Sequence, residues 1–367
     1  NVILTINADL QKAAEDALAG KTGAIAAVDP RDGRILAMVS SPPFDPNLFS
    51  RSISTSEWGE LINNPSRPLM NRCIQTMQPP GSTYKLITAA AALGENTITP
   101  ESSFFCGGSL NFGARPYRCW RKAGHGSVAL ERGIVESCDV YFYQLGILLG
   151  PDLLYRYARA FGFGDLTGIN LREEKKGLIP NSGWYQRRYG IPWQRGESLS
   201  IAIGQGANLV TPLQLVMAYA SLANGGTLYQ PFFVKQVKTA DGTVVKDFSQ
   251  RVRGKLPLSA ATVDYLKECL YKVVNTPSGT GTRAHIPGRD VSGKTGTAQV
   301  INLGRGSRSP RDSELQDHAW FVAYASKDDP RIAVVVYVEH GGHGGSASAP
   351  IAHTVISRLF ELEASGV

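Results

Sequence analysis

Apolar residues follow two rhythms along the chain, strand-like near both ends and helix-like in the middle. Short apolar runs cover residues 23–28 and 34–39, and the turn between them ends in Asp-Gly. This arrangement is typical of a β-hairpin. Three further apolar runs lie late in the chain, at 292–301, 318–326 and 332–339. Strands from the two ends pair most simply in one antiparallel sheet.

Helices are predicted beside and between these strands, because apolar residues recur there at helical spacing. The predicted helices cover 9–19, a segment that follows Gly81, 129–149 with an interruption near Ser137, 151–161, 211–224, 259–276 and 350–364. The segment from about 100 to 130 is rich in glycine and aromatic residues, and we interpret it as a loop. The sequence therefore predicts an α/β (α+β) fold of one domain, residues 1–367. In it an antiparallel sheet is flanked by helices and carries an inserted all-helical subdomain.

The composition is that of a globular protein, with 43% hydrophobic and 19% charged residues. No stretch approaches the roughly 18 consecutive apolar residues of a membrane helix. The net charge is +7, but the basic residues are scattered and no nucleic-acid motif accompanies them, so we expect no nucleic-acid partner. Because the chain opens on Asn1 inside a predicted strand, we expect targeting and anchoring segments upstream of it.

A candidate nucleophile lies where a rigid turn enters an alanine-rich helix. A Pro-Pro-Gly turn precedes Ser82, and proline cannot continue a helix backwards, so the helix is predicted to begin at or beside Ser82. Lys85 lies on the same face of that helix, one turn away. A hydroxyl beside an amine at the positive end of a helix can act as a nucleophile without histidine. The alternative is an ordinary serine N-cap with a surface lysine, because a lone S-x-x-K arises about once by chance in a chain of this length.

A second motif, K-T-G, occurs twice. Its first copy, residues 21–23, precedes the serine and leads into the opening hairpin. Its second copy, residues 294–296, starts a predicted strand between glycine residues, which let a substrate backbone lie close to the strand. Lys294 offers positive charge and Thr295 a hydroxyl to a substrate carboxylate. We therefore favour the second copy.

A third motif, S-x-N, also has two candidates. Residues 109–111 match it strictly but lie in a glycine-rich segment, whereas residues 137–139 carry Asp in place of Asn. The second candidate lies between two predicted helices, and helix ends hold a catalytic hydroxyl better than a glycine-rich loop. We therefore favour Ser137 and Asp139.

With Ser82, Ser137 and Lys294 in this order, the chain resembles the penicillin-binding serine transpeptidases, which carry these three motifs. The resemblance covers nearly the whole chain, and further matching segments are residues 23–38, 44–47, 204–206, 211–215 and 317–321. The flanking sequences look most like class B, the monofunctional enzymes, and closest to the penicillin-binding protein 2 subfamily of Gram-negative rods. The resemblance implies the penicillin-binding/β-lactamase-like fold. Asp139 departs from S-x-N by lacking an amide donor, which puts the donor role of that side chain in doubt.

The resemblance implies a D,D-transpeptidase that cross-links peptidoglycan stem peptides by acyl transfer. Ser82 would attack a D-Ala-D-Ala carbonyl while Lys85 takes its proton, and Ser137, with Asp139 nearby, would relay a proton to the leaving amine. Backbone N–H groups of Ser82 and Thr297 would form the oxyanion hole. The residues implied in substrate binding are Lys294, Thr295, Gly296 and Thr297. A β-lactam antibiotic would mimic the peptide and leave a stable ester on Ser82, and catalysis would need no cofactor.

By the same resemblance we expect the chain to be the periplasmic domain of an inner-membrane protein that acts in cell elongation and rod shape. A single membrane anchor and a non-catalytic pedestal domain would lie upstream. The expected partners are a membrane glycosyltransferase, which supplies nascent glycan, and other proteins of the elongation complex.

Two alternative functions share the fold and the Ser–Lys pair. A β-lactamase would hydrolyse the acyl-enzyme quickly, and class A enzymes use a loop Glu for this step. Residues 195–200 resemble that loop only loosely. A non-catalytic β-lactam sensor would keep Ser82 and be inert toward peptides, and the complete set of motifs argues against it.

Three of the five cysteines belong to a group that suits a metal ion. The group consists of Cys106, Cys119, His125 and Cys138, all inside 33 residues. Three thiolates and one imidazole are a common tetrahedral Zn²⁺ set, although the spacing is not that of a named zinc finger. The resemblance to periplasmic enzymes leaves a Cys106–Cys119 disulfide as one alternative, and the absence of both features as the other. A Zn²⁺ ion there would be structural, because Cys138 lies within the S-x-N segment.

Overall fold

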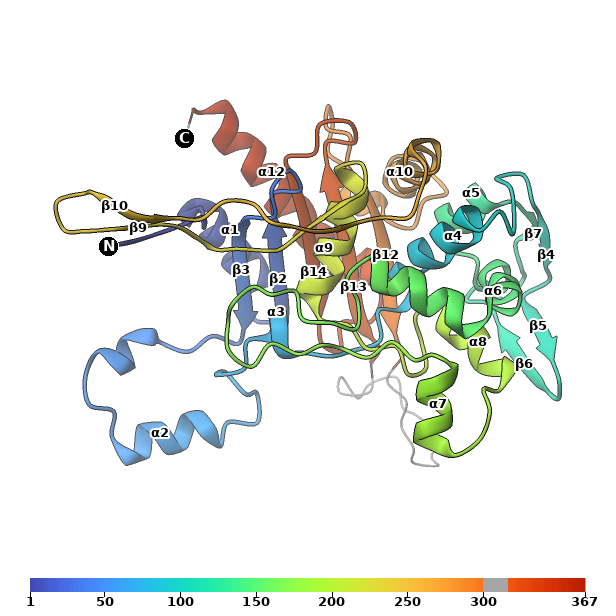
Figure 1. The fold of residues 1–367 in the computed structure, drawn as a ribbon, viewed down its shortest axis with the longest axis horizontal. Coiled ribbons are helices and arrows are strands. Elements are labelled where there is room, and N and C mark those ends of the chain that lie inside the picture. The colour runs from blue at the N-terminus through green and yellow to red at the C-terminus, as the bar shows by residue number, and fades with distance from the viewer. Residues whose placement is uncertain (300–315, 367) are drawn as a thin grey trace.

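The computed structural model describes residues 1–299 and 316–366, and its centre is a five-stranded antiparallel sheet (Figure 1). The strand order is β12-β13-β14-β2-β3, so the sheet joins both ends of the chain, as predicted. Its strands are β2 (Gly23–Val28), β3 (Ile35–Ser41), β12 (Ser292–Ala298), β13 (His318–Ala325) and β14 (Ile332–Val338). The strand predicted to reach residue 301 ends at Ala298, and residues 300 and 301 lie outside the described residues.

Helices cover both faces of this sheet. α1 (Ala8–Leu18) and α12 (Ala349–Ala364) pack on one face, and α9 (Pro212–Ala223) packs on the other. Neighbouring residues of one strand therefore enter two separate cores, since Ile25 joins the core under α1 and α12, whereas Ala26 joins the core under α9. Burial on both faces explains why β2, β13 and β14 are nearly continuous apolar runs instead of alternating patterns.

The subdomain inserted between β3 and β12 is mainly helical, as predicted, but it is not all-helical. Its helices are α4 (Lys85–Gly94), α5 (Leu130–Val135), α6 (Asp139–Ala160), α7 (Ser182–Tyr189) and α8 (Arg195–Ala202). Its short strands, in the segment expected to be a loop, are β4 (Phe104–Cys106), β5 (Ser109–Phe112), β6 (Arg115–Arg118) and β7 (Gly126–Val128), which pair as β4 with β7 and β5 with β6. The prediction of an all-helical subdomain is therefore wrong, because strands of three or four residues are too short to leave a periodic apolar pattern.

The predicted division between residues 129–149 and 151–161 corresponds to a break inside α6. Gly150 has a left-handed φ of +69° there, and the helix is interrupted at that residue. Glycine is the residue that adopts this conformation at least cost, so the break is encoded locally.

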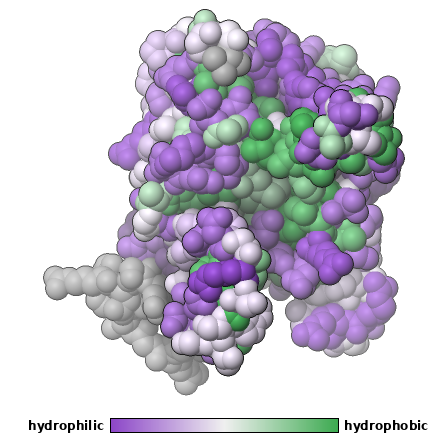
Figure 2. Space-filling model, turned by 90° about the vertical axis from the view of Figure 1, so that its left-hand side faces the viewer, coloured by the Kyte–Doolittle hydropathy of each residue, from purple (hydrophilic) through white to green (hydrophobic). Residues whose placement is uncertain are grey.

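The remaining elements surround this core. They are β1 (Val2–Leu4), η1 (Pro46–Ser50), α2 (Thr55–Ile62), α3 (Arg72–Gln75), β8 (Thr227–Tyr229), β9 (Val234–Lys238), β10 (Val244–Asp247), β11 (Val252–Lys255), α10 (Ala260–Asn275), η3 (Thr282–Ala284) and α11 (Gly344–Ala347). β1, β9 and β10 form a small sheet that projects from one end of the molecule, and apolar patches lie among polar side chains on that face (Figures 1 and 2). Within the described residues, no helix has the length and apolar character needed to span a membrane.

Candidate active site

Ser82 lies in a 3₁₀ turn, η2 (Gly81–Tyr84), that leads directly into α4. The predicted helix therefore starts at Lys85, and Ser82 does not act as its N-cap. Gly81 has a left-handed φ of +56°, and a Cβ atom there would lie 2.4 Å from the carbonyl oxygen of Thr297. Only glycine lets the turn lie this close to β12, and the contact brings the backbone of Ser82 next to that of Thr297.

Ser137 connects the two lysines of the site. Its hydroxyl lies 3.1 Å from Lys85 Nζ and 2.9 Å from Lys294 Nζ, and both amines donate to it. Lys85 Nζ also donates to the Ser137 carbonyl oxygen at 2.8 Å. Ser137 lies between α5 and α6, as predicted, with a left-handed φ of +55°. Because both lone pairs of its hydroxyl accept hydrogen bonds, the hydroxyl proton can be donated to a third group.

Burial makes one of these amines easy to deprotonate. The side chains of Lys85 and Lys294 are fully buried. Desolvation lowers the pKa of Lys294 well below 10.5, the positive charge of Lys85 lowers it further, and the Asp139 carboxylate partly opposes the shift. An amine that loses its charge easily suits proton transfer near neutral pH.

Asp139 is bound through both of its carboxylate oxygens. Oδ1 accepts a hydrogen bond from Lys85 Nζ at 2.8 Å, and Oδ2 accepts one from the backbone N–H of Trp120 at 2.9 Å. Asp139 is also the first residue of α6, where the helix dipole favours negative charge. This side chain therefore orients Lys85 and the 118–120 segment, and it has no donor to offer in place of the amide of S-x-N.

The K-T-G strand, β12, forms another side of a cleft with a volume of about 460 Å³. Thr295 Oγ1 donates to Thr280 Oγ1 at 2.9 Å, and Gln205 Nε2 donates to the Thr297 carbonyl oxygen at 3.0 Å. A Cβ atom on Gly296 would lie 2.7 Å from a carbonyl oxygen of the turn that leads to the serine. The strand thus offers hydroxyls and backbone groups to a ligand in the cleft.

The cleft collects most of the predicted site residues. Those that line it are Ser82, Cys119, Ser137, Asp139, Thr295, Gly296 and Thr297. Lys85 and Lys294 are buried and contact Ser137. The motif copies that were not favoured, residues 21–23 and 109–111, are not among the lining residues. Of each duplicated motif, the copy that lies at the cleft is therefore the one favoured from the sequence.

Several lining residues have no predicted role. They are Arg118, Trp120, Tyr143, Ile203, Gln205, Thr280, Gln299, Asp317, His343, Gly344 and Gly345. Gln205 and Asp317 lie in two of the segments that match the family, so the sequence did contain a signal that could have pointed to them. Trp120 and Thr280 belong to no motif, so only the fold brings them to the cleft.

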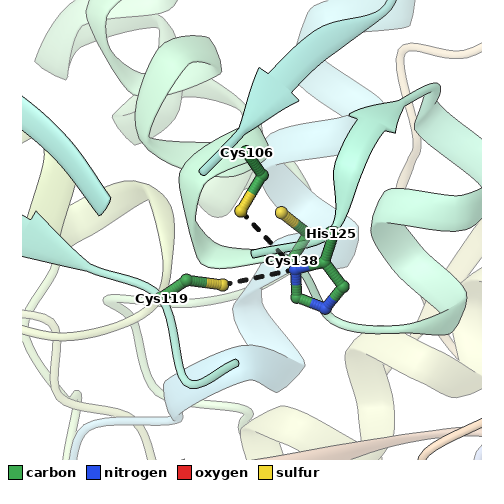
Figure 3. A group of neighbouring side chains, drawn as sticks. All are labelled: Cys106, Cys119, His125 and Cys138. Atoms are coloured by element: carbon green, nitrogen blue, oxygen red, sulfur yellow. Dashed lines mark hydrogen bonds between the residues drawn. The ribbon is translucent and has the colours of Figure 1, made fainter. Parts of the chain in front are cut away.

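The four predicted metal ligands converge beside the Ser137 segment (Figure 3). They are Cys106, Cys119, His125 and Cys138; all four are buried, and their ligand atoms lie within 4.8 Å of one another. His125 Nδ1 lies 3.6 Å from Cys106 Sγ and 3.5 Å from Cys119 Sγ. Zn–S and Zn–N bonds of about 2.3 and 2.0 Å at a tetrahedral angle would put sulfur and nitrogen about 3.5 Å apart. The donor set and its spacing therefore fit a Zn²⁺ ion.

The surroundings of this cluster also fit a metal site. The other ring nitrogen, His125 Nε2, lies 3.9 Å from Glu136 Oε2, and a carboxylate behind a histidine ligand is a common arrangement at zinc sites. All five cysteines are free thiols, so the alternative disulfide between Cys106 and Cys119 is not formed in this structure.

Comparisons with known proteins show which family the chain resembles. The family described as the penicillin binding protein transpeptidase domain matches residues 23–357. The peptidoglycan D,D-transpeptidase MrdA of Haemophilus influenzae is 39% identical over 365 residues, which cover 97% of this chain and 56% of that protein. The chain thus spans just over half the length of this curated relative.

Two solved structures extend the similarity to the fold. Helicobacter pylori PBP2, in complex with MreC, has a TM-score of 0.87 and 31% identity, over 98% of this chain and 64% of that one. Mycobacterium tuberculosis penicillin-binding protein A, as a ceftriaxone acyl-enzyme, has a TM-score of 0.85 and 30% identity, over 98% of this chain and 79% of that one.

Proposed function

Because this chain belongs to the penicillin-binding protein transpeptidase family, we propose that it is a serine D,D-transpeptidase that cross-links peptidoglycan stem peptides. The observation that carries the proposal is the pair of buried amines on the Ser137 hydroxyl, in a cleft that also contains Ser82. The similarity to MrdA and PBP2 enzymes supports a class B enzyme that acts in cell elongation and rod shape.

In the acylation step, Ser82 Oγ forms a bond to the carbonyl carbon of the penultimate D-Ala. Its proton passes to Lys85 when that amine is in its neutral form, and the Asp139 carboxylate at 2.8 Å stabilises the ammonium that forms. The bond to the terminal D-Ala nitrogen breaks, and that nitrogen takes a proton through Ser137. An amine of a second stem peptide then attacks the ester, gives up its proton and releases Ser82.

Substrate binding falls to β12 and the turn before α4. The terminal carboxylate binds the hydroxyls of Thr295 and Thr297 and the positive charge of Lys294 when that amine is protonated. The backbone N–H groups of Ser82 and Thr297 stabilise the oxyanion, and the close contact of η2 with β12 holds them together. A β-lactam enters the same cleft as a mimic of D-Ala-D-Ala.

Labelling of the intact protein with a fluorescent penicillin tests the nucleophile. We expect one label on each wild-type chain and none on the Ser82→Ala variant, with both proteins equally stable to heat. Equal labelling of the two proteins would refute the whole assignment.

Two further measurements separate the transpeptidase from its alternatives. A penicilloyl adduct that persists for hours supports a transpeptidase, whereas loss of the adduct within milliseconds would indicate a β-lactamase. Release of D-alanine from a stem peptide, with transfer of the acyl group to an added amine, distinguishes an enzyme from a sensor that only reacts with β-lactams.

A structural Zn²⁺ ion held by Cys106, Cys119, Cys138 and His125 Nδ1 is part of the same proposal. Such an ion would cross-link the segment that carries Ser137 to the neighbouring strands. Its role would be structural, since the proposed catalysis needs no cofactor. The convergence of four buried donors supports it. The test is the zinc content per chain together with a count of reactive thiols in purified protein. Absence of metal with two oxidised cysteines would overturn this part.

The cellular setting also belongs to the proposal. We place this chain in the periplasm, as part of an inner-membrane protein with an anchor and a pedestal domain upstream and a membrane glycosyltransferase as partner. The complex of Helicobacter pylori PBP2 with MreC supports association with other proteins of the elongation complex. Depletion of the full-length protein in its host should turn rods into spheres, and unchanged rods would contradict the assignment.

A further inference from the structure

One positive charge in the cleft has no part in the mechanism above. Arg118, at the end of β6, is exposed and is the single Lys or Arg side chain among the described residues that line the cleft. Its guanidinium makes no ion pair or hydrogen bond with any of the residues 1–299 and 316–366. Lys85 and Lys294, by contrast, are buried and bound to Ser137.

The backbone of Arg118 is held in a defined position. Its carbonyl oxygen accepts a hydrogen bond from the Tyr143 hydroxyl at 3.0 Å, and Arg118 pairs with Ser109 across the β5–β6 hairpin. Tyr143 is itself buried within α6. The side chain therefore starts from a fixed backbone position at the wall of the cleft, which lowers the entropy lost when it binds an anion.

Trp120 provides a rigid apolar surface beside this charge. Its side chain is 60% exposed, yet its indole Nε1–H donates to the carbonyl oxygens of Glu136 and Ser137, each at 3.1 Å. Its backbone N–H is bound by Asp139. An exposed aromatic ring that is fixed at its polar end offers its apolar surface to a ligand without first having to be ordered.

We propose that Arg118 binds a carboxylate on the acyl-donor peptide, on the side of the attacked carbonyl that precedes the terminal D-Ala. This inference rests on the proposed function. In the proposed function, Thr295 and Thr297 bind the terminal carboxylate of the donor peptide. The 118–120 segment lies on the other side of the cleft, because the hydrogen bond from the Trp120 N–H to Asp139 holds it beside the S-x-N segment. The preceding residues of the donor lie along Trp120, and an anionic group on them meets Arg118.

Arginine suits this task because its planar guanidinium can bind both oxygens of a carboxylate. At an exposed position the gain is moderate. About 1.4 kcal/mol, which equals a tenfold change in a rate or binding constant, is the expected scale. Arg118 would thus select acidic donor peptides rather than perform a chemical step.

The experiment compares two synthetic donors, N-acetyl-L-Glu-D-Ala-D-Ala and N-acetyl-L-Gln-D-Ala-D-Ala, by the kcat/KM for release of D-alanine. The wild-type protein should prefer the Glu peptide by about tenfold. Arg118→Gln should reduce this ratio to about one, and Arg118→Lys should retain part of it. Arg115→Gln is the matched control, because Arg115 is exposed on the same strand but does not line the cleft, and it should keep the wild-type ratio.

A second readout needs no turnover, namely the concentration of each peptide that halves the rate of Ser82 labelling by fluorescent penicillin. Heat stability and zinc content of each variant check that the neighbouring Cys119 is undisturbed. The inference is overturned if the wild-type protein does not prefer the Glu peptide to the Gln peptide, or if Arg118→Gln keeps the wild-type preference. In either case, labelling that depends on Ser82 would leave the proposed function intact. Loss of that labelling in the wild-type protein would instead refute the proposed function and this inference with it.

Discussion

The cleft has two sides that are built in different ways. The β12 side is held by backbone, because all seven residues of the strand, Ser292 to Ala298, pair with β13. The Ser137 side is a short connection between two helices, held by two lysines and by the cysteine cluster. The side built from backbone can bind substrate with little adjustment. The side built from charges and thiols depends on protonation and, under the proposal above, on a bound metal ion. Substitutions should therefore act differently on the two sides.

The largest expected effect comes from Lys294, which links the two sides. Lys294→Met should slow penicillin acylation by about 10³-fold, since it removes an amine from the Ser137 hydroxyl. It should also raise the free energy of unfolding by about 1–3 kcal/mol, because an uncharged side chain replaces a desolvated amine. Stopped-flow labelling and thermal unfolding measure the two effects.

Lys21→Met is the matched control for this variant, because Lys21 is the lysine of the other K-T-G copy and is exposed. It should change neither the acylation rate nor the stability. An acylation rate of Lys294→Met equal to that of the wild type would contradict the mechanism.

A smaller effect, confined to the Ser137 side, is expected from the cysteine cluster. Cys106→Ser should remove bound zinc and slow acylation by about 10- to 100-fold, because the Ser137 segment loses its cross-link. Metal analysis and labelling rates are the measurements. Cys269→Ala, at a buried cysteine outside the cluster, should keep its metal. Full acylation by a metal-free Cys106→Ser protein would show that the cluster does not support the site.

A still smaller effect is expected at Asp139. Asp139→Asn restores the family's S-x-N pattern but removes the charge that holds Lys85 at 2.8 Å, so acylation should fall by about tenfold. The acylation rate of Asp139→Ala should be lower still, since this variant also loses the hydrogen bond to the Trp120 N–H. Faster acylation by the Asn variant would indicate that a donor at this position matters more than the charge.

The last effect concerns β13, the strand that pairs with β12, and appears in stability alone. Burial lowers the pKa of His318 from 6.5 to about 4, and the nearby His340 contributes to the shift. His318 Nδ1 also accepts the backbone N–H of His340 at 3.0 Å, which requires that nitrogen to be unprotonated. The unfolded chain therefore binds the proton first as the pH falls. Stability is complete above about pH 7 and declines from pH 6.5 to 4.

Denaturant unfolding between pH 8 and pH 4 measures this decline. His318→Asn keeps an acceptor at the same position but cannot be protonated, so its stability should fall less over this range. His353→Asn, at a half-buried histidine on α12, should follow the wild-type curve. Parallel curves for all three proteins would exclude His318 as the source.

Most of the fold could be predicted because the central strands are buried on both faces. Continuous apolar runs such as 332–339 then stand out, and the strong helices have regular apolar spacing. The short strands between residues 104 and 128 could not be predicted, because they are held by a few cross-strand bonds and by the cysteine cluster. The 3₁₀ turn at Ser82 was also missed, since it depends on the contact of Gly81 with β12.

The amino-acid sequence by itself determined which chemical groups are available: the serine, the two lysines, the K-T-G strand and a Cys/His set of suitable composition. These groups can be recognised in the sequence because each is marked by a local feature, namely a turn, a helix end or a set of ligand residues. Only the tertiary structure decided that Lys85 binds Asp139, that Trp120 is fixed against the Ser137 segment, and that Arg118 lines the cleft with no side-chain partner among residues 1–299 and 316–366. These contacts join residues that belong to different elements, and the folding of the chain brings them together.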